Sequence, residues 1–265
     1  MKRSTPLIAT PISHQFENET YGGEISEASD CLEVRERSLD TEWANQFLFH
    51  IDVDLTHEWN DEMHTYLSTA FNKKPHLRLI TLQATRCCLG ERLIDGMFQL
   101  EGKIYSAREM IDNSIVNSKW LREKLSPDTA IGLENNNYYP TPAYQDVTDG
   151  DFISEVLEEN DLFLLLDIAH AMVAAHNKNL SYDQYIASLP LHRIIQLHIC
   201  QPKLPVGGVA VDAHGAPDEG MFQEVLRLVE KLPNIKYLTI EYYKDKDILI
   251  ESILHLRQLL KINNV

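Results

Sequence analysis

The chain has 265 residues, 44% of them hydrophobic and 8% aromatic, which is enough apolar material for the core of an ordinary globular protein. This length is close to the roughly 250 residues typical of one (β/α)8 barrel. Forty acidic residues against 24 basic ones give a formal net charge of −16 at pH 7. The acidic surplus argues against partners such as nucleic acid or an anionic membrane surface, because both attract basic protein surfaces.

The sequence contains no pattern typical of a membrane span, a secretory signal or a disulfide framework. No uncharged apolar run reaches the roughly 20 residues of a membrane span. The first 16 residues contain two prolines and no apolar segment typical of a secretory signal. The four cysteines, with Cys87 and Cys88 adjacent, do not have the spacing of a disulfide framework. We therefore expect a reduced, cytoplasmic protein.

Short β-rich runs recur along the chain, and several are almost continuously apolar, as expected of strands that are covered on both faces. The sequence predicts eight strands, at Pro6–Thr10, Cys31–Arg35, Gln46–Val53, Leu77–Ala84, Thr129–Asn135, Leu162–Ile168, Ile194–Ile199 and Tyr237–Tyr242.

Helical patterns lie between these runs. The sequence predicts helices at Asp61–Asn72, Ser106–Leu125, Asp151–Glu159, Tyr182–Ser188, Glu219–Lys231 and Asp247–Leu260. Alternating strands and helices are typical of a parallel α/β fold, and eight strands in this length favour a closed (β/α)8 TIM barrel over an open sheet. No linker-like stretch divides the chain, so we expect residues 1–265 to form a single barrel domain.

Polar residues interrupt five of the apolar strands, at His50, Glu134, Asp167, His198 and Glu241. In a (β/α)8 barrel the carboxyl ends of the strands meet at one mouth, which is where active sites lie. Buried carboxylates must be paired or must coordinate a metal, because an unpaired buried charge is very costly. The set therefore predicts a divalent-metal site at the mouth of the barrel.

The connections after the strands add further candidate ligands. His170 follows Asp167 by three residues, close to the point where the strand gives way to a helix. Asp212 and His214 are two residues apart, and residues at this spacing point to the same side of an extended segment. Carboxylate and imidazole ligands suit iron, manganese or zinc.

Each of these residues, taken singly, has an ordinary structural explanation. A histidine in a strand is more often a core residue, and a carboxylate at a strand end is more often a helix cap or half of an ion pair. That explanation must succeed independently at all five strands, so the set favours a metal site. We assign no role to five other histidines, which fall on expected helices or in turns: His57, His64, His76, His192 and His255. His14 and His176 are expected near the mouth, and their role stays open. Of the cysteines only Cys200, which closely follows His198, is singled out.

Several motifs in the correct order resemble those of the multinuclear non-haem iron-dependent oxidative enzymes, the family of the methanobactin-biosynthesis oxidase. The resemblance is sharpest between Gly132 and Glu241. The matching segments are Gly132-Leu-Glu134-Asn-Asn, Leu164-Leu-Leu-Asp167, Pro190-Leu-His-Arg-Ile-Ile-Gln-Leu-His198, Asp212-Ala-His214-Gly and Ile240-Glu241. In the N-terminal half it is thinner, with Leu32-Glu33-Val34 and Phe49-His50.

The resemblance implies a xylose-isomerase-like barrel that holds two or three irons in mixed Fe(II) and Fe(III) states. By this resemblance, Glu134 bridges two irons. Asp167, His198 and Glu241 complete one of these irons, and His50 serves the other. His170, Asp212 and His214 then hold a third iron.

One position departs from the family pattern. The family has a histidine on the fourth strand that binds the same iron as the histidine of the third strand. Here Gln83 takes that place, in the segment Leu82-Gln83-Ala84. A carboxamide oxygen is a neutral ligand and weaker than imidazole, so the iron served by His50 is expected to be loosely held or absent.

The function implied by the resemblance is an O2-dependent oxidative modification of a ribosomally synthesised precursor peptide. A separate partner protein that recognises the leader of the peptide would deliver it. The residues alone leave three alternatives open: a sugar isomerase or epimerase that uses manganese or cobalt, a three-zinc abasic-site endonuclease, and a non-catalytic scaffold subunit. The net charge makes DNA a poor ligand, and the identity and number of bound metal ions separate the others.

Overall fold

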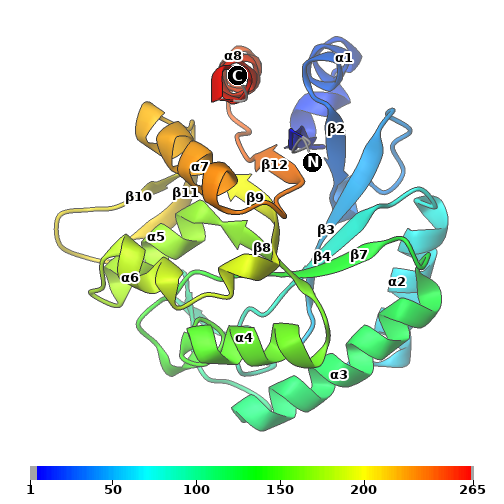
Figure 1. The fold of residues 1–265 in the computed structure, drawn as a ribbon. Coiled ribbons are helices and arrows are strands. Elements are labelled where there is room, and N and C mark those ends of the chain that lie inside the picture. Colours follow the sequence, from blue (N-terminus) through cyan, green and yellow to red (C-terminus); the bar gives the residue numbers. More distant parts are fainter. Residues whose placement is uncertain (1–4, 264–265) are drawn as a thin grey trace.

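Eight parallel strands form a closed barrel in the computed structural model, which describes residues 5–263 (Figure 1). The strands are β1 (Leu7–Pro11), β2 (Cys31–Val34), β3 (Gln46–Asp54), β4 (Leu79–Gln83), β7 (Ala130–Glu134), β8 (Phe163–Asp167), β9 (Ile194–Ile199) and β12 (Tyr237–Ile240). Their order around the barrel is β1-β12-β9-β8-β7-β4-β3-β2. The predicted α/β barrel is confirmed, and each of the eight predicted strands corresponds to one of these.

Helices surround the barrel, as Figure 1 shows. They are α1 (Glu19–Ala28), α2 (Asp61–Lys73), α3 (Ala107–Lys124), α4 (Gly150–Glu159), α5 (Ile168–Asn177), α6 (Tyr182–Ala187), α7 (Glu219–Lys231) and α8 (Lys246–Asn263). Helices α1 and α8, from opposite ends of the chain, pack against each other beside the closure between β1 and β12. Within the described range, no helix has both the length and the apolar character needed to span a membrane.

The alternation of strand and helix differs from the prediction in two ways. Helices α1 and α5 were not predicted, and β2 is joined to β3 without an α-helix, through a 3-10 turn at Glu36–Ser38. Helix α1 contains Gly22 and Gly23, which weaken the helical signal, but the Asn18 side chain caps its first turn. Helix α5 follows β8 directly, since Asp167 is both the last strand residue and the helix N-cap.

Two small antiparallel hairpins extend from the loops after β4 and β9, and the sequence did not predict them. The first pairs β5 (Leu93–Ile94) with β6 (Met97–Phe98), and the second pairs β10 (Gln201–Lys203) with β11 (Val211–Gly215). Strand β11 carries Asp212 and His214, so one of the predicted ligand pairs lies on a hairpin.

Residues at alternate positions of a strand point to the same side. This alternation determines where polar side chains lie inside the barrel. Cys31, Leu48 and Tyr237 are buried and belong to one small apolar group. Two residues after Cys31 and Leu48 come the buried Glu33 and His50. Apolar side chains therefore give way to polar ones towards the carboxyl ends of the strands.

Asn135, fully buried just after β7, ties that strand end to β8. Its side-chain oxygen accepts a hydrogen bond from the Asp167 backbone N–H at 2.8 Å, and its amide donates to the Asp167 carbonyl at 3.0 Å. Both backbone groups of Asp167 are thereby held by one side chain. Asn135 fixes the position of Asp167 relative to Glu134 on the neighbouring strand.

Replacing Asn135 by alanine should destabilise the fold by about 1–3 kcal/mol, because it leaves the buried N–H of Asp167 without its partner. Urea unfolding midpoints at an unchanged m-value measure this loss. Val116→Ala, at a side chain that is 66% exposed on α3, serves as the control and should change stability by less than about 0.5 kcal/mol. Equal stability of N135A and V116A would contradict the proposed tie.

Candidate metal centre

His198, at the carboxyl end of β9, lies at the middle of the ligands predicted from the strand ends. Its Nδ1 is 3.1 Å from Glu134 Oε1, 3.3 Å from Glu241 Oε2 and 4.0 Å from Asp167 Oδ2. The side chains of all four residues are at least 96% buried. Strands β7, β8, β9 and β12 thus direct three carboxylates and one imidazole towards a common point.

Two buried atoms at this point have no hydrogen-bond partner: Asp167 Oδ2 and His198 Nδ1. Asp167 uses its other oxygen as a helix cap, since Oδ1 accepts the backbone N–H of His170 at 2.7 Å. Asp167 can therefore cap the helix with Oδ1 and still offer Oδ2 to a metal. A buried polar atom without a partner is costly, and a cation bound between these atoms removes that cost.

The orientation of His198 leaves Nδ1 free for a metal. Its Nε2 lies 3.1 Å from Glu33 Oε2, and an ionised carboxylate only accepts, so Nε2 carries the hydrogen. A carboxylate that fixes the far nitrogen of a ligand histidine is a recurrent feature of metal sites, where it sets the tautomer and the ring orientation. Glu33 also accepts a hydrogen bond from Gln196 at 2.6 Å.

The two oxygens of Glu241 likewise have different partners. Oε1 forms an ion pair with Arg35 and accepts a hydrogen bond from the Tyr243 hydroxyl at 3.1 Å. Oε2 faces His198 and, at 3.6 Å, Nε2 of His214. Arg35 also pairs with Glu33 at 2.6 Å, so one partly buried guanidinium holds two carboxylates of the centre.

A second group of candidate ligands surrounds His170. The His170 Nδ1 donates to the Asn135 carbonyl at 2.9 Å, which leaves Nε2 directed at Asp167 Oδ2, 3.8 Å away, and at Asp212 Oδ2, 3.6 Å away. Asp212 Oδ2 is also 3.1 Å from His214 Nδ1. The structure therefore brings His170, Asp212 and His214 together next to Asp167.

The remaining two predicted residues, His50 and Gln83, lie on the opposite side of Glu134. His50 Nε2 is 3.5 Å from Glu134 Oε2, and the Gln83 amide nitrogen is 3.3 Å from the same oxygen. All eight predicted ligands and Gln83 thus line one continuous cluster. Glu134 is its centre, with one oxygen towards His198 and the other towards His50.

Burial and the charges of neighbouring side chains together determine the protonation of this cluster. Burial raises the pKa of Asp167 to about 7, with the nearby charges of Asp212 and Glu134 acting in the same direction. Burial opposes ionisation of Glu33, but Arg35 and His198 outweigh it and hold the pKa of Glu33 at about 2. A metal bound near Asp167 would favour the ionised carboxylate and lower its pKa.

Glu33 and Arg35 contact the candidate ligands His198 and Glu241, and the sequence analysis gave them no part in the site. Glu33 is fully buried in an apolar strand, so the rule applied to the other five strands also applies to it. The signal was present in Leu32-Glu33-Val34, and Arg35 two residues later lies on the same side.

Cys200, the one cysteine singled out from the sequence, is buried beside the second ligand group. Its thiol donates to Asp212 Oδ1 at 3.5 Å, and burial raises the pKa of this thiol well above its usual range. It is therefore a neutral donor to Asp212 in the metal-free chain.

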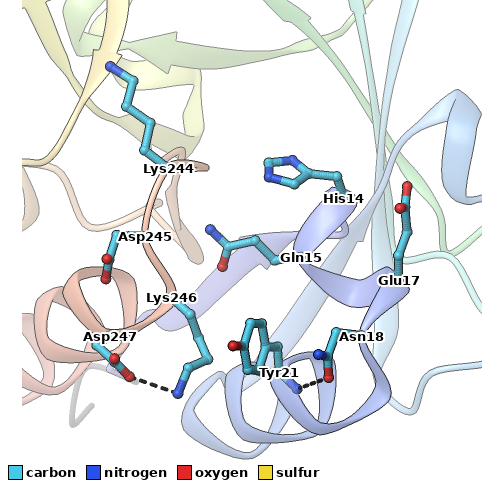
Figure 2. Close-up of a pocket in the computed structure, with 9 residues that line it drawn as sticks. All are labelled: His14, Gln15, Glu17, Asn18, Tyr21, Lys244, Asp245, Lys246 and Asp247. Carbon is cyan, nitrogen blue, oxygen red and sulfur yellow. Dashed lines mark hydrogen bonds and ion pairs between the residues drawn. The ribbon is translucent and has the colours of Figure 1, made fainter.

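A cavity of about 560 Å³ lies between the segments that follow β1 and β12 (Figure 2). Gln15 and Lys244 are among the residues that line it. The Gln15 amide donates to the Tyr243 carbonyl at 2.8 Å, and the Tyr243 hydroxyl in turn bonds Glu241. Tyr243 therefore connects the wall of this cavity to the ligand cluster.

The fold and this ring of carboxylates and imidazoles define a xylose-isomerase-like TIM barrel. A xylose isomerase-like TIM barrel protein from Mycobacterium smegmatis, solved in complex with magnesium, superposes with a TM-score of 0.62 at 10% identity, covering 98% of each chain. D-psicose 3-epimerase from Clostridium cellulolyticum H10, solved with D-tagatose, gives 0.57 at 12% identity, covering 97% of this chain and 98% of that one. At these identities the likeness is one of fold.

The family is given by the sequence itself. The model of the family described as RiPP precursor modification enzyme MbnB/TglH/ChrH matches residues 105–251, which is more than half of the chain. The chain belongs to this family, and the predicted resemblance is confirmed.

Curated relatives match over shorter segments. A UPF0276 protein of Shewanella amazonensis is 38% identical over 84 residues, which cover 32% of this chain and 30% of that protein. One from Shewanella loihica is 34% identical over 107 residues, covering 40% and 36%. The chain spans about a third of the length of the curated relatives it matches.

Asp167→Asn tests the metal centre without removing the helix cap, because the amide keeps an oxygen for the His170 N–H. Divalent metal at about 100 times Kd should stabilise the wild-type chain by about 2.7 kcal/mol, seen as a rise in Tm. D167N should bind at least about tenfold more weakly, which reduces that gain by about 1.4 kcal/mol. Asp128→Asn, at an exposed turn, is the control and should respond like wild type. An unchanged response of D167N would exclude Asp167 as a ligand.

Glu33→Gln tests how much the contact between Glu33 and His198 Nε2 contributes to metal affinity. The amide keeps the shape of Glu33 but loses the charge that orients His198 and balances Arg35. Metal affinity should fall about 10- to 100-fold, as for other partners of ligand histidines. Isothermal titration measures the affinity, with the exposed Glu27→Gln as control. Wild-type affinity in E33Q would show that Glu33 serves packing alone.

Proposed function

We propose that this protein is a multinuclear non-haem iron-dependent enzyme that uses O2 to modify a ribosomally synthesised precursor peptide oxidatively. The observation that carries the proposal is the pair of buried, unpartnered atoms, Asp167 Oδ2 and His198 Nδ1, inside a ring of carboxylates. Membership of a family of RiPP precursor modification enzymes supports the peptide substrate.

The ligand assignment follows the geometry. In this proposal Glu134, Asp167, His198 and Glu241 hold one ion, because the His198 and Asp167 atoms converge with the two glutamates. A second ion lies among the neighbouring residues His170, Asp212 and His214.

The donor set suits iron. Carboxylate and imidazole ligands with no thiolate among the four inner groups match non-haem iron sites, although manganese and zinc accept the same donors. Iron held here would supply the one-electron and O2 chemistry that amino-acid side chains lack. The residues of the chain bind and orient the metal and keep it in a dry, buried site.

Arg35 has a defined part in this proposal. Its guanidinium stays charged at every physiological pH and neutralises Glu33 and Glu241 from the side of β2. Because Glu241 Oε1 is engaged with Arg35 and Tyr243, only Oε2 is left for a metal. Arg35 therefore keeps Glu241 a single-oxygen ligand and limits the negative charge that the metal must balance.

We place the entry of the peptide at the cavity between the segments after β1 and β12. Gln15 in the wall of this cavity donates to the Tyr243 carbonyl, and the Tyr243 hydroxyl bonds Glu241, so one residue links the cavity to the ligands. Delivery by a leader-recognising partner protein belongs to the proposal and rests on the family resemblance.

The rival functions have weaker support. The likeness to sugar epimerases is one of fold at 12% identity, and the net charge of −16 disfavours an abasic-site endonuclease. A scaffold subunit would not need buried ligand atoms without partners. Two irons per chain after anaerobic loading would favour the oxidase, and a preference for manganese or zinc would favour the rivals.

Iron-loaded protein should change the mass of its substrate peptide only when O2 is present. The test uses the short peptides encoded next to the gene of this chain, incubated with protein that was reconstituted anaerobically with Fe(II). Mass spectrometry before and after admission of air measures the product. D167N should lower the yield at least about a hundredfold, since it removes a ligand of the inner ion.

D128N serves as the matched control and should give the wild-type yield. A mass change that proceeds equally without O2, or in iron-free protein, would overturn the proposed oxidative reaction.

A further inference from the structure

We propose that the Gln83 carboxamide takes the place of a cation between His50 and Glu134. The centre then binds metal tightly at the two positions on the Asp167 side and at no third position beside His50. This inference deepens the proposed function and rests on it for the identity of the metal. The hydrogen bonds that carry it are independent of that identity.

The Gln83 side chain, at the carboxyl end of β4, points its amide nitrogen into a group of acceptors. Nε2 lies 3.2 Å from His50 Nε2, 3.3 Å from Glu134 Oε2 and 3.4 Å from Asp52 Oδ1. Carboxylate oxygens only accept, so the nitrogen of the carboxamide, and not its oxygen, faces them. The amide donates where a cation would otherwise balance Glu134.

This arrangement also determines the tautomer of His50. An amide nitrogen only donates, so His50 Nε2 accepts from Gln83 and carries no hydrogen. The hydrogen is then on Nδ1, which donates to Thr81 Oγ1 at 2.9 Å. Both ring nitrogens of His50 have partners in the metal-free chain.

The two sides of Glu134 therefore differ. On the Asp167 side, Asp167 Oδ2 is buried without a hydrogen-bond partner, and His198 Nδ1 faces Glu134 and Glu241 at 3.1 and 3.3 Å without an aligned hydrogen bond. On the His50 side, the Gln83 amide already donates to both acceptors, His50 Nε2 and Glu134 Oε2. A cation removes a cost on the first side, whereas on the second it must displace hydrogen bonds that already exist.

Distance alone does not exclude an ion beside His50, since ligand atoms of His50, Glu134 and His198 lie within 4.8 Å of one another. To admit it, the Gln83 amide must rotate so that its oxygen faces the ion. That rotation gives up the bonds to His50 and Glu134 and offers a neutral carbonyl in return. The donor position of the amide therefore disfavours the third ion.

The test counts tightly held ions with Zn(II) as the probe, without O2 and without peptide. Each protein is loaded with Zn(II), freed of loose metal on a chelating resin and analysed by mass spectrometry for metal per chain. Wild type should retain two ions, and Gln83→His should retain three, because imidazole replaces the donor amide with a ligand. Gln83→Glu should also gain one ion and covers the case in which Q83H fails to fold, as judged by circular dichroism.

Gln145→His, at an exposed position, controls for the addition of a histidine and should retain the wild-type count. Three tightly held ions in wild type would overturn the inference. So would an unchanged count in folded Q83H and Q83E. Because Zn(II) is redox-silent and no peptide is present, failure of the proposed oxidation leaves this count unaffected, and the two failures are distinguishable.

Discussion

The burial of four carboxylates at one end of a barrel is the constraint on which the rest of the site depends. Glu33, Glu134, Asp167 and Glu241 are each 4% exposed or less, and they project from four different strands into one volume. Such charges must be balanced locally, because water does not reach them. The neighbouring residues are understood best by how each one supplies that balance.

The negative charge of these carboxylates is compensated differently on each side of the barrel. On the side of β2, Arg35 supplies a permanent positive charge to Glu33 and Glu241. On the side of β4, the Gln83 amide supplies neutral hydrogen bonds to Glu134. On the side of β8, Asp167 Oδ2 has no hydrogen-bond partner, and this is where we propose that a cation binds. The charge of Arg35, the amide of Gln83 and the unpartnered oxygen of Asp167 thus belong to one connected group of side chains.

The sequence predicted the barrel and the grouping of the candidate ligands because both follow from local patterns: apolar strands at regular intervals, several with a polar residue near the end. It could not predict the contacts across strands, such as Glu33 with His198, because these depend on strand register and barrel closure. Glu33 followed by Arg35 has the pattern of an ordinary surface ion pair, and only the complete burial of Glu33 and the partial burial of Arg35 show otherwise. The donor orientation of Gln83 is likewise set by three residues of other strands, His50 and Asp52 on β3 and Glu134 on β7, none of them adjacent to Gln83 in sequence.

Anomalous diffraction at the iron absorption edge, from crystals of protein loaded anaerobically with Fe(II), tests the central claim most directly. The account predicts one iron bound by Glu134, Asp167, His198 and Glu241 and a second bound by His170, Asp212 and His214. Iron found elsewhere, or no anomalous peak at Asp167 and His198 in fully loaded protein, would contradict it.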